Sequence, residues 1–140
     1  MTVSSASACV CESGQTYAQC CGRFLDKGDI ATTAALLMRS RYSAYVLQRE
    51  DYLLATWHQT TRPPSLSLTK ADDADTNWLG LSIRRSMTNG DRASVEFVAR
   101  FRIDGKRAER LHEVSRFVRE NGHWFYVDGE VNYPALKDGA

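Results

Sequence analysis

Four cysteines near the start of the 140-residue chain are the residues whose types and spacing most directly predict chemistry. A disulfide framework stabilises a fold by closing long loops between distant segments, which cysteines confined to so short a stretch do not do. Two close pairs of thiolates separated by a short loop instead match the tetrahedral sulfur set of a structural zinc ion. The alternative is a set of reduced or redox-active cysteines without a metal. The predicted zinc ligands are Cys9, Cys11, Cys20 and Cys21.

The residues between the two cysteine pairs predict how the chain brings them together. Ser13 and Gly14 favour a tight turn that reverses the chain direction. Residues 16–19 are expected to form a helical turn that delivers the second pair, and Gly22 lets the chain leave the site. Since four sulfurs leave no position open for water, the predicted zinc is structural.

This cysteine pattern resembles the SEC-C zinc motif, a knuckle known from the bacterial preprotein-translocase motor. Residues 9–21 contain every ligand position that the resemblance implies. Val10 and Glu12 differ from the usual Cys-Pro-Cys-Gly-Ser-Gly opening, in which proline and glycine stand there, and neither is a ligand position. We therefore expect residues 1–22 to form a zinc knuckle, and we keep that name for them below.

A second set of residues with possible chemistry lies on a predicted strand and a predicted helix. Glu113 and Ser115 alternate with bulky apolar residues, so a carboxylate and a hydroxyl share a face that should be apolar. Arg41 lies between apolar positions of the helix. In a pocket interpretation, Arg41 binds an anionic group while Glu113, with His58 or His112, handles a proton. The predicted pocket residues are Arg41, Tyr42, Tyr45, Trp57, His58, Glu113 and Ser115, with Glu113 as the candidate catalytic carboxylate.

The alternative for the same residues is structural. Arg41 and Glu113 then form a fixed ion pair that ties the helix to the sheet, with the aromatic residues in the core. His112 is expected on the opposite face of the strand from Glu113. The sequence contains no Ser-His-Asp order, phosphate-binding glycine loop or histidine ligand set, so hydrolase, nucleotide and catalytic-metal chemistry lack support.

Helices are predicted between the knuckle and the strands. Apolar residues at spacings of three and four predict a helix over 31–46, with Asp29 near its N-cap. A short second helix is expected over 52–58, with Asp51 as its cap. Residues 23–29 are expected to be a linker between the knuckle and these helices.

Beyond a polar loop at 65–77, the spacing of the apolar residues shortens to two, which indicates strands. Helices followed by strands predict an α+β architecture in which a curved sheet wraps the helices. Four antiparallel strands are expected around 78–83, 95–103, 110–119 and 124–128, with turns at 88–91, 104–106 and 120–122.

The order of elements and several short phrases resemble the bacterial YchJ-like family, in which a SEC-C knuckle precedes a domain shaped like nuclear transport factor 2. The resemblance implies that residues 23–140 form an α+β, cystatin-like cone of helices packed on a curved antiparallel sheet. It implies no particular activity. The phrases lie at 38–45, 53–58, 95–101, 111–113, 115–117 and 124–129.

Composition restricts the partners. With 18 basic and 17 acidic side chains the formal net charge is +1, so we expect no general attraction to nucleic acid. The longest purely apolar run, 34–38, is far shorter than the roughly 20 residues that cross a bilayer, so no membrane span is expected. The first residues lack the features of a signal peptide, which predicts a cytoplasmic protein with reduced thiols.

Two functional hypotheses follow. The first is a non-enzymatic, zinc-containing binding or adaptor protein for a protein partner or a small ligand, with a possible homodimer through the outer sheet face. The second is a small-molecule isomerase or dehydratase that uses Glu113 inside the cone. A deep, partly polar pocket that converges on Glu113 and Arg41 favours the enzyme, whereas a filled aromatic core with an exposed knuckle favours the adaptor.

Overall fold

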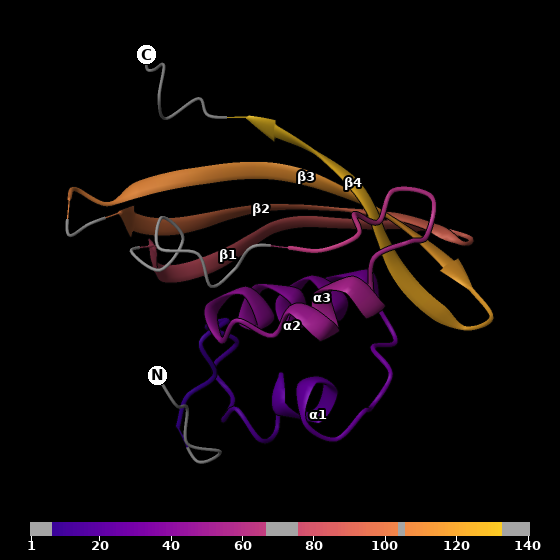
Figure 1. Ribbon diagram of the computed structural model, residues 1–140, viewed down its shortest axis with the longest axis horizontal. Coiled ribbons are helices and arrows are strands. Elements are labelled where there is room, and N and C mark those ends of the chain that lie inside the picture. The colour runs from indigo at the N-terminus through magenta and orange to yellow at the C-terminus, as the bar shows by residue number, and fades with distance from the viewer. Residues whose placement is uncertain (1–6, 67–75, 104–105, 133–140) are drawn as a thin grey trace.

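The computed structural model describes residues 7–66, 76–103 and 106–132. Figure 1 shows four strands as one curved layer, with helices α2 (Ala34–Val46) and α3 (Glu50–Ala55) against one face. Helix α1 (Gly22–Leu25) and the cysteine-bearing part of the knuckle, residues 7–21, lie on the far side of α2 from the sheet. The predicted α+β architecture, helices on a curved antiparallel sheet, is confirmed.

Helix α2 is the central element of the fold. It begins at Ala34 rather than at the predicted residue 31, because the Thr33 hydroxyl accepts a hydrogen bond from Leu36 N at 3.1 Å and caps the helix. Asp29 is therefore not the cap. All residues from Ser40 to Ala44 are buried. Consecutive helical residues point in different directions, so α2 is covered on more than one side.

Two predictions about the shorter helices were wrong. The expected linker at 23–29 contains most of α1, whose turn closes when Leu25 N donates to Cys21 O at 2.9 Å. Helix α3 begins at Glu50, two residues before the predicted start, and Asp51 lies in its first turn instead of capping it. The predicted end at 58 was also too late, because the chain after α3 is extended beside the sheet.

The sheet has the order β1-β2-β3-β4, and every neighbouring pair is antiparallel. Strand β1 is longer than predicted at both ends, because its pairing with β2 continues to the Asn89–Arg92 partners beside the turn at Gly90. The expected turn at 104–106 lies partly outside the described residues. The bounds are Thr76–Asn89 for β1, Arg92–Ile103 for β2, Glu109–Glu120 for β3 and His123–Asn132 for β4.

The face of the sheet toward the helices carries both apolar and polar residues. On β2 alternate residues from Ala93 to Ala99 are buried, as the period of two predicts. The register pairs Phe97 with Glu113 and Val95 with Ser115. Glu113 and Ser115 therefore lie on the concave face, opposite α2.

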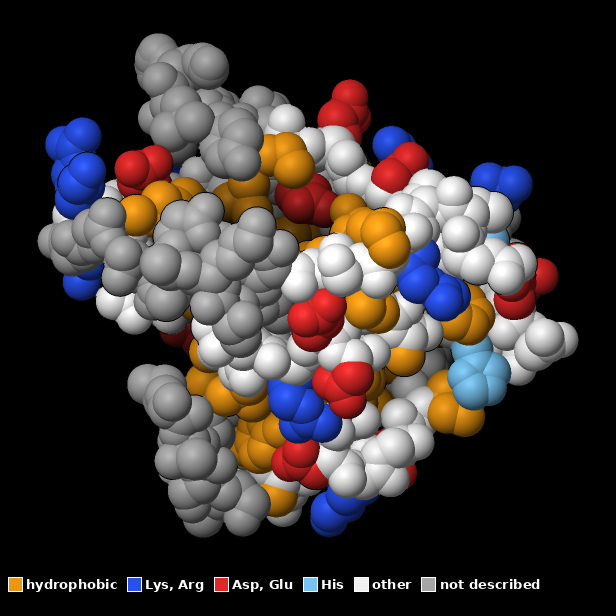
Figure 2. All heavy atoms as spheres, in the orientation of Figure 1, with side chains coloured by type: hydrophobic (Ala, Val, Ile, Leu, Met, Phe, Trp, Pro, Cys, Tyr) orange, Lys and Arg blue, Asp and Glu red, His pale blue; other side chains and the backbone are white. Residues whose placement is uncertain are grey.

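Exposed charges are distributed without one dominant sign. On the face drawn in Figure 2, basic and acidic side chains are interspersed. Some of them pair directly, including Arg49 with Asp26 at 3.0 Å and Arg116 with Asp128 at 2.7 Å. Within the described ranges, no helix has the length and hydrophobicity needed to cross a membrane.

Candidate metal centre and sheet pocket

The four cysteine sulfurs form one compact cluster. They lie within 4.8 Å of one another, and all four residues are buried. Cys20 Sγ is 3.5 Å from Cys11 Sγ and 3.9 Å from Cys21 Sγ. Zinc–sulfur bonds of about 2.3 Å in a tetrahedron imply sulfur–sulfur distances of about 3.8 Å. The cluster therefore fits a four-sulfur metal site.

The chain reversal that forms this cluster follows the predicted turns. Gly14 has φ +92°, a left-handed conformation that glycine adopts readily, and Cys9 N donates to Gln15 O at 2.9 Å across the turn. The second cysteine pair follows a helical turn in which Cys20 N donates to Tyr17 O at 3.1 Å. Both predicted features of the loop are confirmed.

Gly22 ends the knuckle at a point of very close approach. A Cβ atom added at Gly22 would lie 2.8 Å from the carbonyl oxygen of Tyr17, to which Gly22 N also donates a hydrogen bond. Only a residue without a side chain fits there. The sequence analysis expected Gly22 to give the chain freedom, and the structure shows that its main role is to leave room.

Helix α2 supplies hydrogen-bonding groups to the sulfur cluster. Arg39 Nη1 donates to Cys11 O at 2.9 Å and reaches Cys11 Sγ at 3.6 Å. Ser43 Oγ lies 3.8 Å from Cys9 Sγ. Such outer groups orient metal ligands and stabilise thiolate charge. Neither residue was predicted, because nothing in their local pattern distinguishes them from other polar helix residues.

The sulfurs compete with one another for protons. Hydrogen bonds from Cys11 and Cys21 hold the pKa of the Cys9 thiol far below its usual range. The same kind of bonds from Cys11 and Cys9, together with burial, raise the pKa of Cys21 far above it. One thiolate therefore forms easily and the next with difficulty, since negative charge accumulates in a buried space. A divalent cation removes this conflict by replacing the protons.

Glu12 connects the knuckle to the sheet. It has φ +63° at the position where the SEC-C pattern usually has glycine, so the backbone there is left-handed. Its carboxylate forms an ion pair with Arg100 of β2 at 3.2 Å. The pair passes over Gly80 of β1, where a Cβ atom would collide with the Arg100 guanidinium and come within 2.7 Å of the carboxylate. This contact was not predicted.

A cavity of about 260 Å³ lies between α2 and the concave face of the sheet. Tyr126 and Trp78 also line it, and neither was predicted there. The sequence predicted Trp78 and Tyr126 only as strand residues. Local spacing does not show that the fold brings them close to α2. Five of the seven predicted pocket residues line this cavity, namely Arg41, Tyr42, Tyr45, Glu113 and Ser115.

The other two predicted pocket residues lie elsewhere. Trp57 is not part of the cavity lining and packs edge-on against Tyr126, with ring centroids 5.0 Å apart. His58 is also outside the lining and pairs through Nε2 with Glu120 at 2.9 Å. His112 pairs with a carboxylate of β2 on the other side of the sheet from Glu113, as expected. None of these side chains supports the proposed proton transfer with Glu113.

The Glu113 carboxylate occupies a fitted position on the cavity wall. Its Oε2 accepts a hydrogen bond from Ser115 Oγ at 2.6 Å and a longer one from the Tyr126 hydroxyl at 3.4 Å. Gly129 of β4 lies directly beneath, and a Cβ atom there would collide with the carboxylate. The missing side chain of Gly129 therefore makes the space that Glu113 fills.

Arg41 does not pair with Glu113, so the predicted ion pair between them was wrong. Its Nη1 donates instead to Leu53 O at 2.8 Å and to Thr56 Oγ1 at 2.7 Å. The guanidinium also lies over the Tyr126 ring, 4.5 Å from its centroid. Burial lowers the pKa of Arg41. Acceptors supplied by α3 therefore replace the expected carboxylate.

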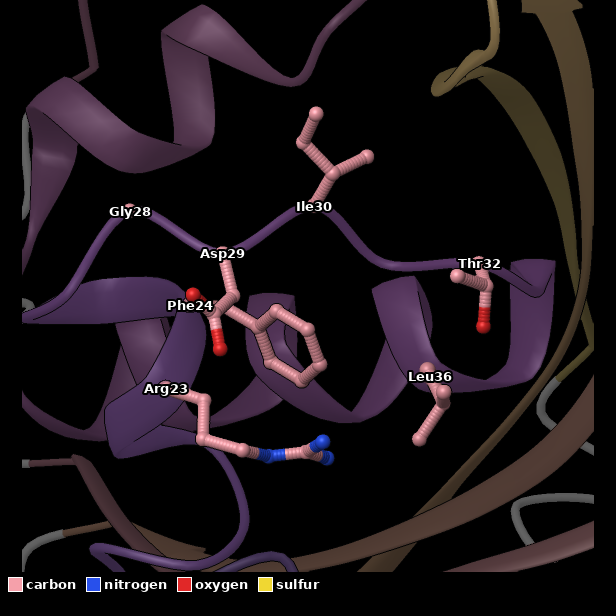
Figure 3. A pocket seen from close by; sticks show the side chains of 7 residues that line it. All are labelled: Arg23, Phe24, Gly28, Asp29, Ile30, Thr32 and Leu36. Atoms are coloured by element: carbon pink, nitrogen blue, oxygen red, sulfur yellow. The ribbon is translucent and has the colours of Figure 1, made fainter.

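A second, larger hollow of about 400 Å³ lies beside α1 (Figure 3). Arg23 lies over the Phe24 ring at 4.7 Å from its centroid, while the half-exposed Ile30 side chain points away from that pair (Figure 3). Arg23 Nε also donates to Cys20 O at 3.1 Å, so this residue supports the knuckle from outside. Among the described residues, no side chains share one acceptor there as Ser115 and Tyr126 share Glu113 Oε2.

Comparisons with known proteins agree with this geometry. The model of the YchJ middle NTF2-like domain matches residues 33–129, and the SEC-C motif matches residues 7–23. A UPF0225 protein of Chromobacterium violaceum is 52% identical over 129 residues, covering 89% of this chain and 93% of that protein. A UPF0225 protein of Bordetella parapertussis is 51% identical over 135 residues, covering 91% and 96%.

Two solved structures are similar over most of the chain. A SEC-C motif containing protein from Rhodopseudomonas palustris has a TM-score of 0.76 and 38% identity, covering 87% of this chain and 96% of that one. A SEC-C motif containing protein from Psychrobacter arcticus has a TM-score of 0.74 and 27% identity, covering 89% and 82%. The chain therefore belongs to the UPF0225 family, with a SEC-C motif in front of a YchJ-type NTF2-like domain.

Proposed function

We propose that the protein binds a small molecule in the cavity between α2 and the sheet, and that a structural zinc ion at the four cysteines completes its fold. Four sulfur ligands are typical of structural zinc sites, and they leave no position for water or substrate. The cysteines are buried against α2. This supports a role in holding the helix rather than in contacting a partner.

The observation that carries the ligand-binding role is the cavity that reaches both Arg41 and Glu113. Small-molecule sites combine apolar walls with a few positioned polar groups. Here aromatic and aliphatic side chains form most of the wall, and Glu113 is held by Ser115 and Tyr126. A core built only for stability would fill this space instead.

Elemental analysis tests the zinc. Protein purified without chelators is expected to hold one zinc ion per chain, and Cys20→Ser is expected to lose it. A purified protein without any tightly held metal would contradict the structural zinc.

Occupancy of the cavity is tested with indole, an uncharged molecule of suitable size, by protein NMR. We expect indole to shift the backbone amide signals of Ala99 and Glu113, which line the cavity. Ala99→Leu fills part of the space and should abolish these shifts. Val98→Leu is the matched control, because the neighbouring residue on β2 points to the other face. Unchanged spectra of the native protein on indole addition would argue against an accessible cavity.

An isomerase or dehydratase is the second candidate function. The observation that favours it is the presence of Glu113 and Arg41 in the lining of the same cavity. A carboxylate base removes a proton from a carbon beside a carbonyl group. Incubation with cyclohexanone in deuterated water would then incorporate deuterium at those carbons, and Glu113→Gln would prevent it. Equal incorporation by the native protein and the variant would exclude Glu113 as the base.

A further inference from the structure

One oxygen of the Glu113 carboxylate is free inside the cavity. The two recorded hydrogen bonds, from Ser115 and Tyr126, both end at Oε2. Oε1 has no hydrogen-bond partner among the described residues. It is not fully buried, because His112 Nδ1 is the one fully buried side-chain N or O atom without a partner among these residues. Glu113 is one of the residues that line the cavity, and Oε1 is the carboxylate oxygen whose hydrogen-bonding capacity is not used by Ser115 or Tyr126. A ligand with a hydrogen-bond donor can therefore reach it without displacing a protein group.

The walls around this oxygen are rich in aromatic rings. Tyr42 and Tyr45 lie 6.0 and 6.4 Å from Trp78, measured between ring centroids, and all three line the cavity together with Tyr126. Aromatic faces attract cations through their ring quadrupoles, most strongly where water is excluded. A free carboxylate oxygen surrounded by aromatic rings is a favourable environment for a positive charge.

Among the described residues of the wall Arg41 is the one basic side chain, and it interacts both with groups outside the lining and with Tyr45 and Glu113 in it. Its Nη1 is shared between Leu53 O and Thr56 Oγ1, both outside the lining. Its guanidinium also lies near the rings of Tyr126 and Trp57, at 4.5 and 5.1 Å from their centroids. Its positive charge is therefore partly satisfied by carbonyl, hydroxyl and π-electron density before any ligand arrives.

The size of the cavity limits the ligand. A cavity of about 260 Å³ has room for a small organic molecule. We propose that the cavity binds a small organic amine, whose ammonium group donates a hydrogen bond to Glu113 Oε1 and whose apolar body lies against Trp78 and Phe97. This inference rests on the proposed ligand-binding function and names its ligand class.

Three probes of nearly equal size and different charge test this inference by titration at neutral pH: 2-phenylethylamine, 2-phenylethanol and phenylacetate. We expect the amine to bind at least tenfold more tightly than the alcohol, and phenylacetate to bind most weakly. In Glu113→Gln the preference for the amine over the alcohol should disappear while the alcohol still binds. Glu96→Gln is the matched control, because that carboxylate pairs with His112 on the other side of the sheet.

The remaining outcomes separate this inference from the function on which it rests. If phenylacetate binds most tightly, Arg41 is the anchor and the amine class is overturned. If the three probes bind equally, the cavity binds ligands but does not select a cation. If none binds, the amine class and the proposed ligand-binding function both fail. Should Glu113→Gln not fold, the order of the three affinities in the native protein still decides the ligand class.

Discussion

The sulfur cluster and the sheet cavity lie on different sides of α2 and use their polar residues in opposite ways. In the knuckle, polar atoms converge, since Arg39 and Ser43 both approach the cysteines. In the cavity they diverge, since Arg41 turns to α3 while Glu113 is held by the sheet. Polar groups that meet at the sulfurs suit a closed structural site. Because Arg41 and Glu113 turn to different partners, Glu113 Oε1 keeps its hydrogen-bonding capacity for a ligand.

Helical periodicity explains how one element serves both regions. Arg39 and Ser43 are four residues apart and therefore lie on one face of α2. Met38, Tyr42 and Tyr45 follow the same spacing on a neighbouring face and line the cavity. The metal site and the cavity consequently depend on the position of a single helix.

Removal of the metal is expected to have the largest effect and tests whether the two regions depend on each other. Structural zinc contributes on the order of 10 kcal/mol in small zinc-dependent folds. We expect chelation or Cys20→Ser to lower the free energy of unfolding by several kcal/mol in urea titrations, and to shift the amide signal of Glu113. Ser13→Ala removes the hydroxyl that donates to Cys20 Sγ at 3.0 Å, and we expect it to cause a smaller loss in the same direction. A stable chelated protein with an unchanged Glu113 signal would show that the regions are independent.

Alkaline titration follows, and for Tyr42 alone the expected loss of stability is about 3 kcal/mol. Burial, together with the charge of Glu12, raises the pKa of Tyr42 to about 12, and burial with Asp26 raises that of Tyr17 further. A raised folded-state pKa favours the neutral phenol, so this stabilisation is complete below about pH 10 and is lost as the pH rises through about 12. Since Tyr17 lies in the knuckle and Tyr42 on the cavity wall, we expect phenolate absorbance to appear in one step with unfolding. Two separate steps would mean that the regions unfold independently.

A pair of glycine substitutions compares the rigidity of the two regions. At Gly22 an added Cβ meets a backbone oxygen of Tyr17, which cannot move without disturbing the turn. At Gly129 it meets the Glu113 carboxylate, the end of a flexible side chain. We expect Gly22→Ala to cost about 2–3 kcal/mol and to weaken metal retention. Gly129→Ala should cost about 1 kcal/mol, leave the metal in place and abolish the amine preference.

Equal costs for these two substitutions in urea titrations would contradict the comparison. So would loss of metal in Gly129→Ala, because that change lies on the far side of the sheet cavity from the knuckle.

The smallest expected effect concerns the ion pair between the knuckle and the sheet. Glu12 and Arg100 are both half-exposed, so Arg100→Ala should cost only about 0.2–1 kcal/mol. Glu12→Gly loses the same pair but relieves the left-handed backbone at φ +63°, so its net effect should be close to zero. In the Glu12→Gly background, Arg100→Ala should then change nothing. A full Arg100 effect in that background would show that Arg100 acts through another contact.

Local spacing predicted the number and order of the strands, but not all of their lengths. Alternation on β2 and the turn residues around Gly90 and Gly122 locate β2 and β3 to within three residues, because a strand repeats every two residues, whereas β1 continues to Asn89 instead of ending at residue 83. The start of α2 was missed because Asp29 and Thr33 are both good capping residues. Helix α1 was missed because its four residues are too few to show a period.

The cavity lining was predicted only in part. Arg41, Tyr42 and Tyr45 follow from the helical face, and Glu113 and Ser115 from the strand, since each set shares a local period. Trp57 lies after α3 and was misplaced because the turn of the chain beyond that helix depends on its pairing with Tyr126 of β4. Such pairing joins segments that are distant in sequence.

The sequence by itself determined the metal-binding potential of this protein, because four cysteines within one short loop can meet without help from distant elements. It also determined which residues of β3 face the helices, through their period of two. Only the tertiary structure decided what those residues do. Whether Arg41 pairs with Glu113 depends on competing acceptors. Helix α3 brings Leu53 O within hydrogen-bond distance of the guanidinium, and the missing side chain of Gly129 leaves the space that the Glu113 carboxylate fills. The outcome of that competition is what leaves the cavity with a carboxylate oxygen open to a ligand.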